Sequence, residues 1–111
     1  MTPNKYQELA KRTAPDYGSY KENSSYYYIG LNGEAGEVGE ILKRHLYRGE
    51  PLDFEHLKDE LGDVLWYLTM LIDQYGFKLE DIMEENINKL ANRYKDRSQL
   101  PLPTLAGMEG A

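Results

Sequence analysis

The sequence predicts an all-α fold, a bundle of three or four helices. Three observations support this prediction: apolar side chains recur at helical intervals, the breaks between these stretches are short, and no stretch alternates like a β-strand. A chain of 111 residues suffices for one domain with one hydrophobic core. We expect a single helical domain at residues 1–95, followed by an irregular C-terminal tail at residues 96–111 that holds prolines and glycines without periodicity.

Two helices are expected in the first half of the chain. One spans about residues 4–12, where Thr2 can act as the N-cap and Pro3 suits the first turn. A longer one begins near residue 23 or 24 and runs to about residue 47, with a buried stripe at helical spacing. The alternative is a later start at Asn32.

Four glycines at three-residue spacing fall inside this long helix. They are Gly30, Gly33, Gly36 and Gly39, and each interior glycine costs a helix about 1 kcal/mol relative to alanine. Because the periodicity continues across them, we keep the helix and expect another backbone, of this chain or of a partner, to approach closely there.

Two further helices are expected in the second half. Gly49 and Pro51 end the long helix, and Asp53 is a suitable N-cap for a helix over about residues 54–75. A last helix covers about residues 79–94. The third helix carries the broadest apolar stripe, formed by Leu57, Leu61, Val64, Leu65, Leu68, Leu71 and Ile72.

The amino-acid composition limits the classes of partner and of metal site that the protein can have. The net charge of −6 argues against a nucleic-acid polymer as partner, although a metal ion could mediate contact with a nucleotide. The absence of cysteine excludes disulfides and thiolate metal sites. No stretch has the length or apolarity of a secretory signal or a membrane helix, so the sequence-based expectation is a cytoplasmic protein without a membrane partner.

Two pairs of acidic residues, which we call the acidic steps, are the strongest indication of function in the sequence. Glu34 and Glu37 lie three residues apart on the second predicted helix, and Glu60 and Asp63 do so on the third. Their angular positions turn Glu34 and Glu60 towards the apolar sector and leave Glu37 and Asp63 at its rim. Carboxylates gathered near a core would repel one another unless a divalent cation joined them, and oxygen ligands favour Mg²⁺ or Mn²⁺. The alternative is that all four are ordinary surface charges.

The last helix carries a polar strip beside its apolar stripe. Asn86, Lys89 and Arg93 have the spacing of one helical face, and their side chains suit phosphate oxygens. Lys43 is a further candidate for phosphate binding. The alternative is that the basic residues compensate the helix dipole in solvent.

Aromatic and histidine side chains are weaker candidates. Trp66 lies close to Asp63 in the sequence and could stack on a base, although packing at a subunit interface is the more common role of such a side chain. His45 and His56 show no partner at metal-ligand spacing, so we assign neither to the site. The tyrosine-rich segment at residues 17–28 has no assigned role.

The ordered motifs together resemble the MazG-like nucleotide pyrophosphohydrolases, of the all-α NTP pyrophosphatase superfamily. The motifs are Glu34-x-x-Glu37, Glu60-x-x-Asp63 and Asn86-x-x-Lys89-Leu90-x-x-Arg93-Tyr94, and the strings GLNGEAGEVGEILKR and LKDELGDVLWYL are similar to family members beyond the acidic positions. The similarity covers about residues 24–94.

The resemblance implies a four-helix-bundle fold completed by dimerisation, as a homodimer or homotetramer. It implies Mg²⁺-dependent cleavage of a nucleoside triphosphate into monophosphate and pyrophosphate, with nucleotide-pool house-cleaning as one role. Carried over by position, the four carboxylates Glu34, Glu37, Glu60 and Asp63 are metal ligands, and Glu34 or Glu37 is the catalytic residue that orients the attacking water. Asn86, Lys89 and Arg93 contact phosphate or complete the metal site.

Two alternatives remain open at this stage. The chain could be a non-catalytic helical regulator that binds nucleotide or a protein partner, or an enzyme that acts on a phosphoribosyl nucleotide. The sequence does not choose the base or the sugar.

Overall fold

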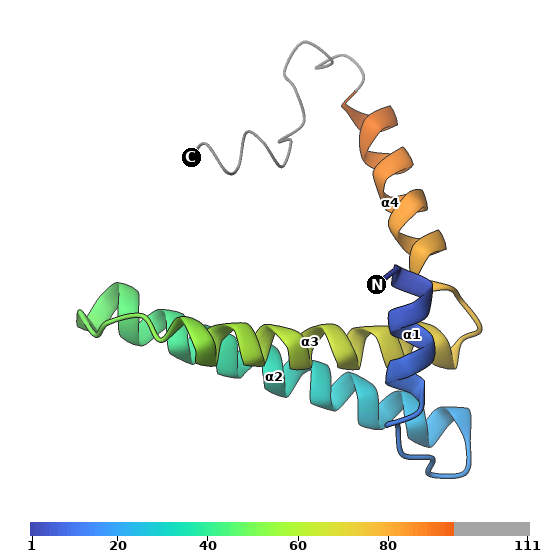
Figure 1. Cartoon of the computed structure of the whole chain (residues 1–111), viewed down its shortest axis with the longest axis horizontal. Coiled ribbons are helices and arrows are strands. Elements are labelled where there is room, and N and C mark those ends of the chain that lie inside the picture. Colours follow the sequence, from blue (N-terminus) through green and yellow to red (C-terminus); the bar gives the residue numbers. More distant parts are fainter. Residues whose placement is uncertain (95–111) are drawn as a thin grey trace. The chain divides into compact units, whose positions relative to one another are not determined.

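The computed structural model describes residues 1–94, which form four helices and no strand (Figure 1). The helices are α1 (Pro3–Lys11), α2 (Tyr20–Arg48), α3 (Phe54–Gln74) and α4 (Leu79–Arg93). The all-α prediction is confirmed. The tail expected at residues 96–111 lies outside the described residues.

Short polar side chains cap three of the helix N-termini. Thr2 Oγ1 accepts a hydrogen bond from Lys5 N at 3.1 Å, Ser19 Oγ from Glu22 N at 3.1 Å, and Asp53 Oδ1 from His56 N at 3.1 Å. The caps of α1 and α3 were predicted. Because Ser19 caps α2, this helix begins at Tyr20, a few residues before the predicted start, and the alternative start at Asn32 is wrong.

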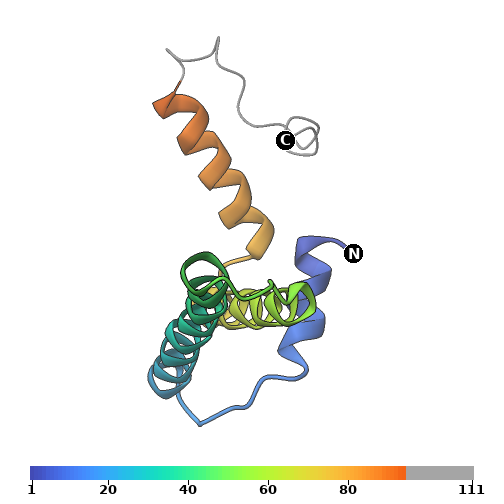
Figure 2. The ribbon, with the colours of Figure 1, turned by 90° about the vertical axis from the view of Figure 1, so that its left-hand side faces the viewer.

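A left-handed glycine ends the longest helix. Gly49 has a φ of 69°, and its backbone N–H donates to Arg44 O. The short connection to Phe54 returns the chain as α3, so that α2 and α3 lie side by side in antiparallel orientation (Figure 2). This pair provides the two facing surfaces on which the acidic steps lie.

A small core joins α1 to the helical pair. Ala10, Tyr27 and Met70 are buried together, one from each of α1, α2 and α3. Thr69 beside Met70 is fully buried, and its hydroxyl donates to Leu65 O at 2.7 Å. The core therefore lies towards the N-terminal half of α2 and the C-terminal half of α3.

Gln7 ties α1 to the connection between α3 and α4. Its side chain is 8% exposed, and its amide donates to Asp73 Oδ1 at 3.0 Å and to Phe77 O at 2.9 Å. Its amide oxygen accepts from Leu79 N at 2.7 Å, at the start of α4. All three polar contacts are internal, so α1 is held by hydrogen bonds as well as by apolar packing.

The broad apolar stripe predicted on α3 is only partly covered. Leu71 and Ile72 are half-buried, whereas Leu61, Leu65 and Leu68 are 49%, 44% and 40% exposed. These three leucines remain partly exposed in the single chain, because no described helix of residues 1–80 lies over them.

Of the four glycines within α2, only Gly30 has a close neighbour among the described residues, and the approach of a partner's backbone stays a prediction. A Cβ atom at Gly30 would overlap the ring of Tyr67, so the close neighbour is a side chain of α3 rather than a backbone. At Gly33, Gly36 and Gly39 no atom of the described residues lies within 4 Å of such a Cβ. Among residues 1–94, packing therefore requires glycine at only one of the four positions.

Backbone contacts divide the chain into two compact units, residues 1–80 and residues 81–111. The first contains α1, α2 and α3, and most of α4 belongs to the second. Within residues 1–94, no helix is both long and apolar enough to cross a membrane.

Candidate metal centre

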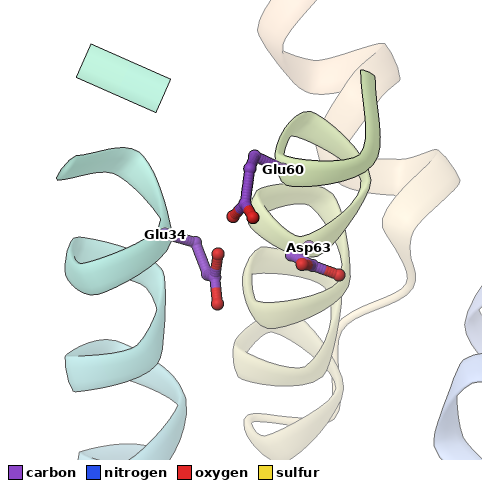
Figure 3. Close-up of side chains that lie close together, drawn as sticks. All are labelled: Glu34, Glu60 and Asp63. Carbon is purple, nitrogen blue, oxygen red and sulfur yellow. The ribbon is translucent and has the colours of Figure 1, made fainter. Parts of the chain in front are cut away.

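Three carboxylates from two helices converge between α2 and α3. Glu34 extends from α2, and Glu60 and Asp63 extend from consecutive turns of α3 (Figure 3). One oxygen atom from each side chain lies within 4.8 Å of the other two. Three members of the predicted acidic set are thus brought together by the antiparallel pair.

The local sequence explains this convergence. Glu60 and Asp63 are three residues apart, which places both on one face of α3. Glu34 lies on the facing side of α2, in the half-buried row that also contains Leu31 and Val38. Two helical patterns and one short connection are enough to bring the three carboxylates together.

The electrostatics of the cluster disfavour full ionisation. The pKa of Glu34 is raised from 4.5 to about 7, first by a hydrogen bond with Glu60, then by burial and by the charges of Glu60, Asp63 and Glu37. The pKa of Asp63 is also raised, by burial and by the charges of Asp59 and Glu60. Without a cation, Glu34 therefore holds its proton to a higher pH than an isolated glutamate does.

An orphaned oxygen shows that the cluster fits a cation. The Glu60 side chain is 15% exposed, and its Oε2 atom is buried without a hydrogen-bond donor among the described residues. A buried carboxylate oxygen without a partner is costly, and a divalent cation beside Glu34 and Asp63 would satisfy it. Three carboxylates with no nitrogen or sulfur in the set are the donors that Mg²⁺ and Mn²⁺ prefer.

Glu37 lies outside the group of three. Its side chain is exposed on α2, although its charge contributes to the raised pKa of Glu34 and it is therefore a near neighbour. Ligation of a metal or orientation of water by Glu37 stays a prediction.

The residues predicted to bind phosphate are on α4, apart from Lys43 on α2. Asn86, Lys89 and Arg93 are exposed on α4, in the second unit, so their contact with the carboxylates stays a prediction. Lys43 is on α2, where its Nζ lies 3.8 Å from a carboxylate oxygen of Glu40 in an exposed ion pair.

Trp66 packs inside the chain. Its indole N–H donates to Thr13 Oγ1 at 3.0 Å, and its ring makes edge-to-face contacts with Tyr27 and Tyr67 at centroid distances of 5.9 Å and 5.0 Å. The structure thus gives Trp66 a packing role on α3, against Thr13 after the end of α1 and against Tyr27 of α2, and base stacking stays a prediction.

Sequence reasoning missed three neighbours of the carboxylates. His56 Nε2 lies 3.5 Å from Glu60 Oε1, which corrects the expectation that this histidine has no partner, and the i, i+4 spacing was the available signal. Tyr67 follows Asp63 by the same spacing. Its pKa is raised to about 12, first by a hydrogen bond with Tyr26 and by burial, with smaller contributions from the charges of Glu34 and Asp63. Tyr6 of α1 is also close, since the charge of Asp63, after burial, raises its pKa.

Comparison with known proteins agrees with the motifs. The family model "MazG nucleotide pyrophosphohydrolase domain" matches residues 23–98. Gene 37 protein of Mycobacterium phage L5 is 39% identical over 100 residues, which cover 83% of this chain and 87% of the phage protein. Uncharacterized protein YvdC of Bacillus subtilis (strain 168) is 32% identical over 74 residues, which cover 59% of this chain and 70% of that protein. No solved structure matches the chain.

Proposed function

This chain belongs to the MazG nucleotide pyrophosphohydrolase family, and from that premise we propose that it hydrolyses nucleoside triphosphates to the monophosphate and pyrophosphate. The observation that carries the proposal is the convergence of Glu34, Glu60 and Asp63, with one oxygen of each within 4.8 Å of the others. Such a cluster is expensive in a protein that holds no cation, whereas it suits one that binds a metal–triphosphate complex.

The proposed reaction is a water-dependent cleavage between the α and β phosphates. Water attacks the α-phosphorus, the bond from that phosphorus to the bridging oxygen breaks, and pyrophosphate leaves as a proton is released. A bound Mg²⁺ or Mn²⁺ would supply neutralisation of the charge that develops on the phosphoryl oxygens.

The chain's own residues divide the remaining work. Glu34, Glu60 and Asp63 hold the cation between α2 and α3. One carboxylate of α2 orients the attacking water, either Glu37, which is exposed one turn after Glu34, or Glu34 itself. Lys89 and Arg93 of α4 bind the leaving pyrophosphate, with Asn86 as a further ligand to metal or phosphate.

A nucleotide panel with product identification tests the proposal. Purified protein is incubated with each ribo- and deoxyribonucleoside triphosphate and Mg²⁺ or Mn²⁺, and pyrophosphate is measured separately from orthophosphate. We expect monophosphate and pyrophosphate in equal amounts, and loss of activity on addition of EDTA. Binding of nucleotide without release of pyrophosphate would contradict the proposal and favour a regulatory role.

Asp63→Asn is the informative variant, because it keeps the shape of the side chain and removes its charge. We expect at least about a hundredfold loss of activity with the helical circular dichroism spectrum retained. Glu40→Gln is the matched control, since Glu40 pairs with Lys43 and Arg44 on the surface rather than with the cluster. Equal activity of Asp63→Asn and the wild-type chain would remove the cluster from the mechanism.

We further propose that the functional unit is a homo-oligomer, a dimer or a tetramer. The support is the row of exposed leucines on α3, Leu61, Leu65 and Leu68, which share one helical face. A second copy of the chain would cover them and complete the bundle. Light scattering coupled to size exclusion should give a multiple of the chain mass, and Leu65→Glu should shift it to one chain. A monomeric wild-type protein would contradict this assignment. House-cleaning of the nucleotide pool and a cytoplasmic location stay predictions.

A further inference from the structure

A close contact between α2 and α3 lies one helical turn from the carboxylates. At Gly30 the ring of Tyr67 rests directly against the backbone of α2, and a methyl group there would overlap its Cε1, Cδ1 and Cζ atoms. Gly30 precedes Glu34 by four residues, and Tyr67 follows Asp63 by four. Four residues of an α-helix span about 6 Å along its axis. Because the two helices are antiparallel, moving from Gly30 to Glu34 and from Tyr67 to Asp63 leads in the same direction, towards the cluster.

Neighbouring aromatic side chains restrain the Tyr67 ring. Its hydroxyl is hydrogen-bonded to that of Tyr26, one turn before Gly30 on α2. The ring centroids of Tyr26 and Tyr67 are 6.0 Å apart, and Trp66 contacts Tyr67 edge-to-face at 5.0 Å. The ring is therefore fixed on both sides, so its thickness determines how closely the helices approach.

The spacing of the helices in turn determines the spacing of the carboxylates. Glu34 is carried by one helix and Glu60 and Asp63 by the other, so a change in their separation moves the two halves of the cluster apart. Oxygen ligands lie about 2.0–2.6 Å from divalent cations in the size range from Mg²⁺ to Ca²⁺. Even a small change in helix separation would therefore move a carboxylate out of ligand distance.

We propose that Tyr67 is a positioning residue for the cation site: its ring, seated on Gly30, sets the separation of α2 and α3 at which Glu34 meets Glu60 and Asp63. This inference rests on the proposed function, because it assigns Tyr67 a role at the cation site on which that function depends. Tyr67 does not ligate the cation, and it acts through the backbone positions of the three carboxylates.

Binding of Mn²⁺, followed by electron paramagnetic resonance, tests the proposal without nucleotide. Gly30→Ala displaces the ring, and we expect it to weaken Mn²⁺ binding by about tenfold or more, in the range seen for residues that orient metal ligands. Gly39→Ala is the matched control on the same helix, because it has no neighbour within 4 Å among the described residues. It should leave the Kd unchanged. Circular dichroism and thermal unfolding check that both variants fold.

A double-mutant cycle separates positioning from a general loss of stability. In a Tyr67→Ala background, which itself binds Mn²⁺ weakly, Gly30→Ala should add no further loss, because the clash partner is gone. Tyr67→Phe keeps the ring and should retain near wild-type affinity. If Gly30→Ala fails to fold, Tyr67→Phe and Tyr67→Ala still test the proposal, because only loss of the ring should weaken Mn²⁺ binding.

Several results would overturn the inference. Wild-type affinity in Gly30→Ala or in Tyr67→Ala would do so, as would additive losses in the cycle. A wild-type chain that binds Mn²⁺ but releases no pyrophosphate would refute the proposed function alone, and the Kd values would still test the positioning role. A wild-type chain that binds no Mn²⁺ would refute both.

Discussion

Glu34→Gln should remove most of the pH dependence of stability in metal-free protein. The pKa of Glu34 is about 7 in the folded chain, against 4.5 ordinarily, so the folded state binds this proton more tightly than the unfolded state. The resulting stabilisation is complete below about pH 4.5 and is lost as the pH rises through about 7. The wild-type chain in EDTA should therefore unfold at a lower temperature at pH 8 than at pH 5.

The magnitude follows from the interval between the two pKa values. That interval corresponds to at most about 3 kcal/mol, and we expect about 1–2 kcal/mol because Glu34 is only partly buried and water screens the cluster. For a domain of this size the midpoint of thermal unfolding should differ by about 5–15 °C. Glutamine cannot ionise and can still donate to Glu60, so the variant should be the more stable protein at pH 8 in EDTA.

The assay is thermal unfolding at several pH values, in EDTA and in excess Mn²⁺. Titrating groups that do not interact with Glu34 contribute equally to both proteins and cancel in the comparison. Mn²⁺ should stabilise the wild-type chain at pH 8, by about 2.7 kcal/mol at a concentration a hundred times the Kd, and should stabilise Glu34→Gln much less. Parallel pH profiles of the two proteins in EDTA, or lower stability of the variant at pH 8, would refute the reasoning.

Three further predictions concern residues outside the cluster. Gln7→Ala should lower the free energy of unfolding by about 2–4 kcal/mol, because it removes three internal hydrogen bonds at a buried position; urea denaturation measures this, and a change below about 1 kcal/mol would contradict it. Asn23→Ala, also at a buried position, should cost about 1–3 kcal/mol in the same assay, since Asn23 accepts from Tyr17 N at 2.7 Å; an unchanged midpoint would count against that role. Lys89→Ala and Arg93→Ala should each raise the KM for triphosphate without changing the unfolding temperature, and an unchanged KM would remove that residue from phosphate binding.

The helices could be predicted because their signals are local. Thr2 and Asp53 are caps that depend only on neighbouring backbone N–H groups, and Gly49 ends α2 by its own left-handed conformation. The start of α2 was placed too late because the segment after Ser19 is rich in tyrosine and lacks an apolar stripe. Its helical state depends on the Ser19 cap and on burial of Tyr27 against other helices.

The site could be predicted only in part, for a related reason. Spacing along one helix identifies which carboxylates share a face, which was enough for Glu60 and Asp63. Angular position also distinguished Glu34, which was expected to point inward, from Glu37 at the rim, but it placed Asp63 at the rim as well. That Asp63 nevertheless joins Glu34 depends on the register between the helices, which spacing along one helix does not give. The contact between the Tyr67 ring and Gly30 also depends on the register between the helices.

The short connection between α2 and α3 has a consequence for folding. The chain between Glu34 and Glu60 is only about 26 residues long, so bringing the two together carries a small entropic cost compared with contacts between distant segments. A cation held there would link the two helices only in the folded chain, because the three carboxylates separate and release it when the hairpin unfolds. Divalent cations should therefore slow unfolding of the α2–α3 hairpin.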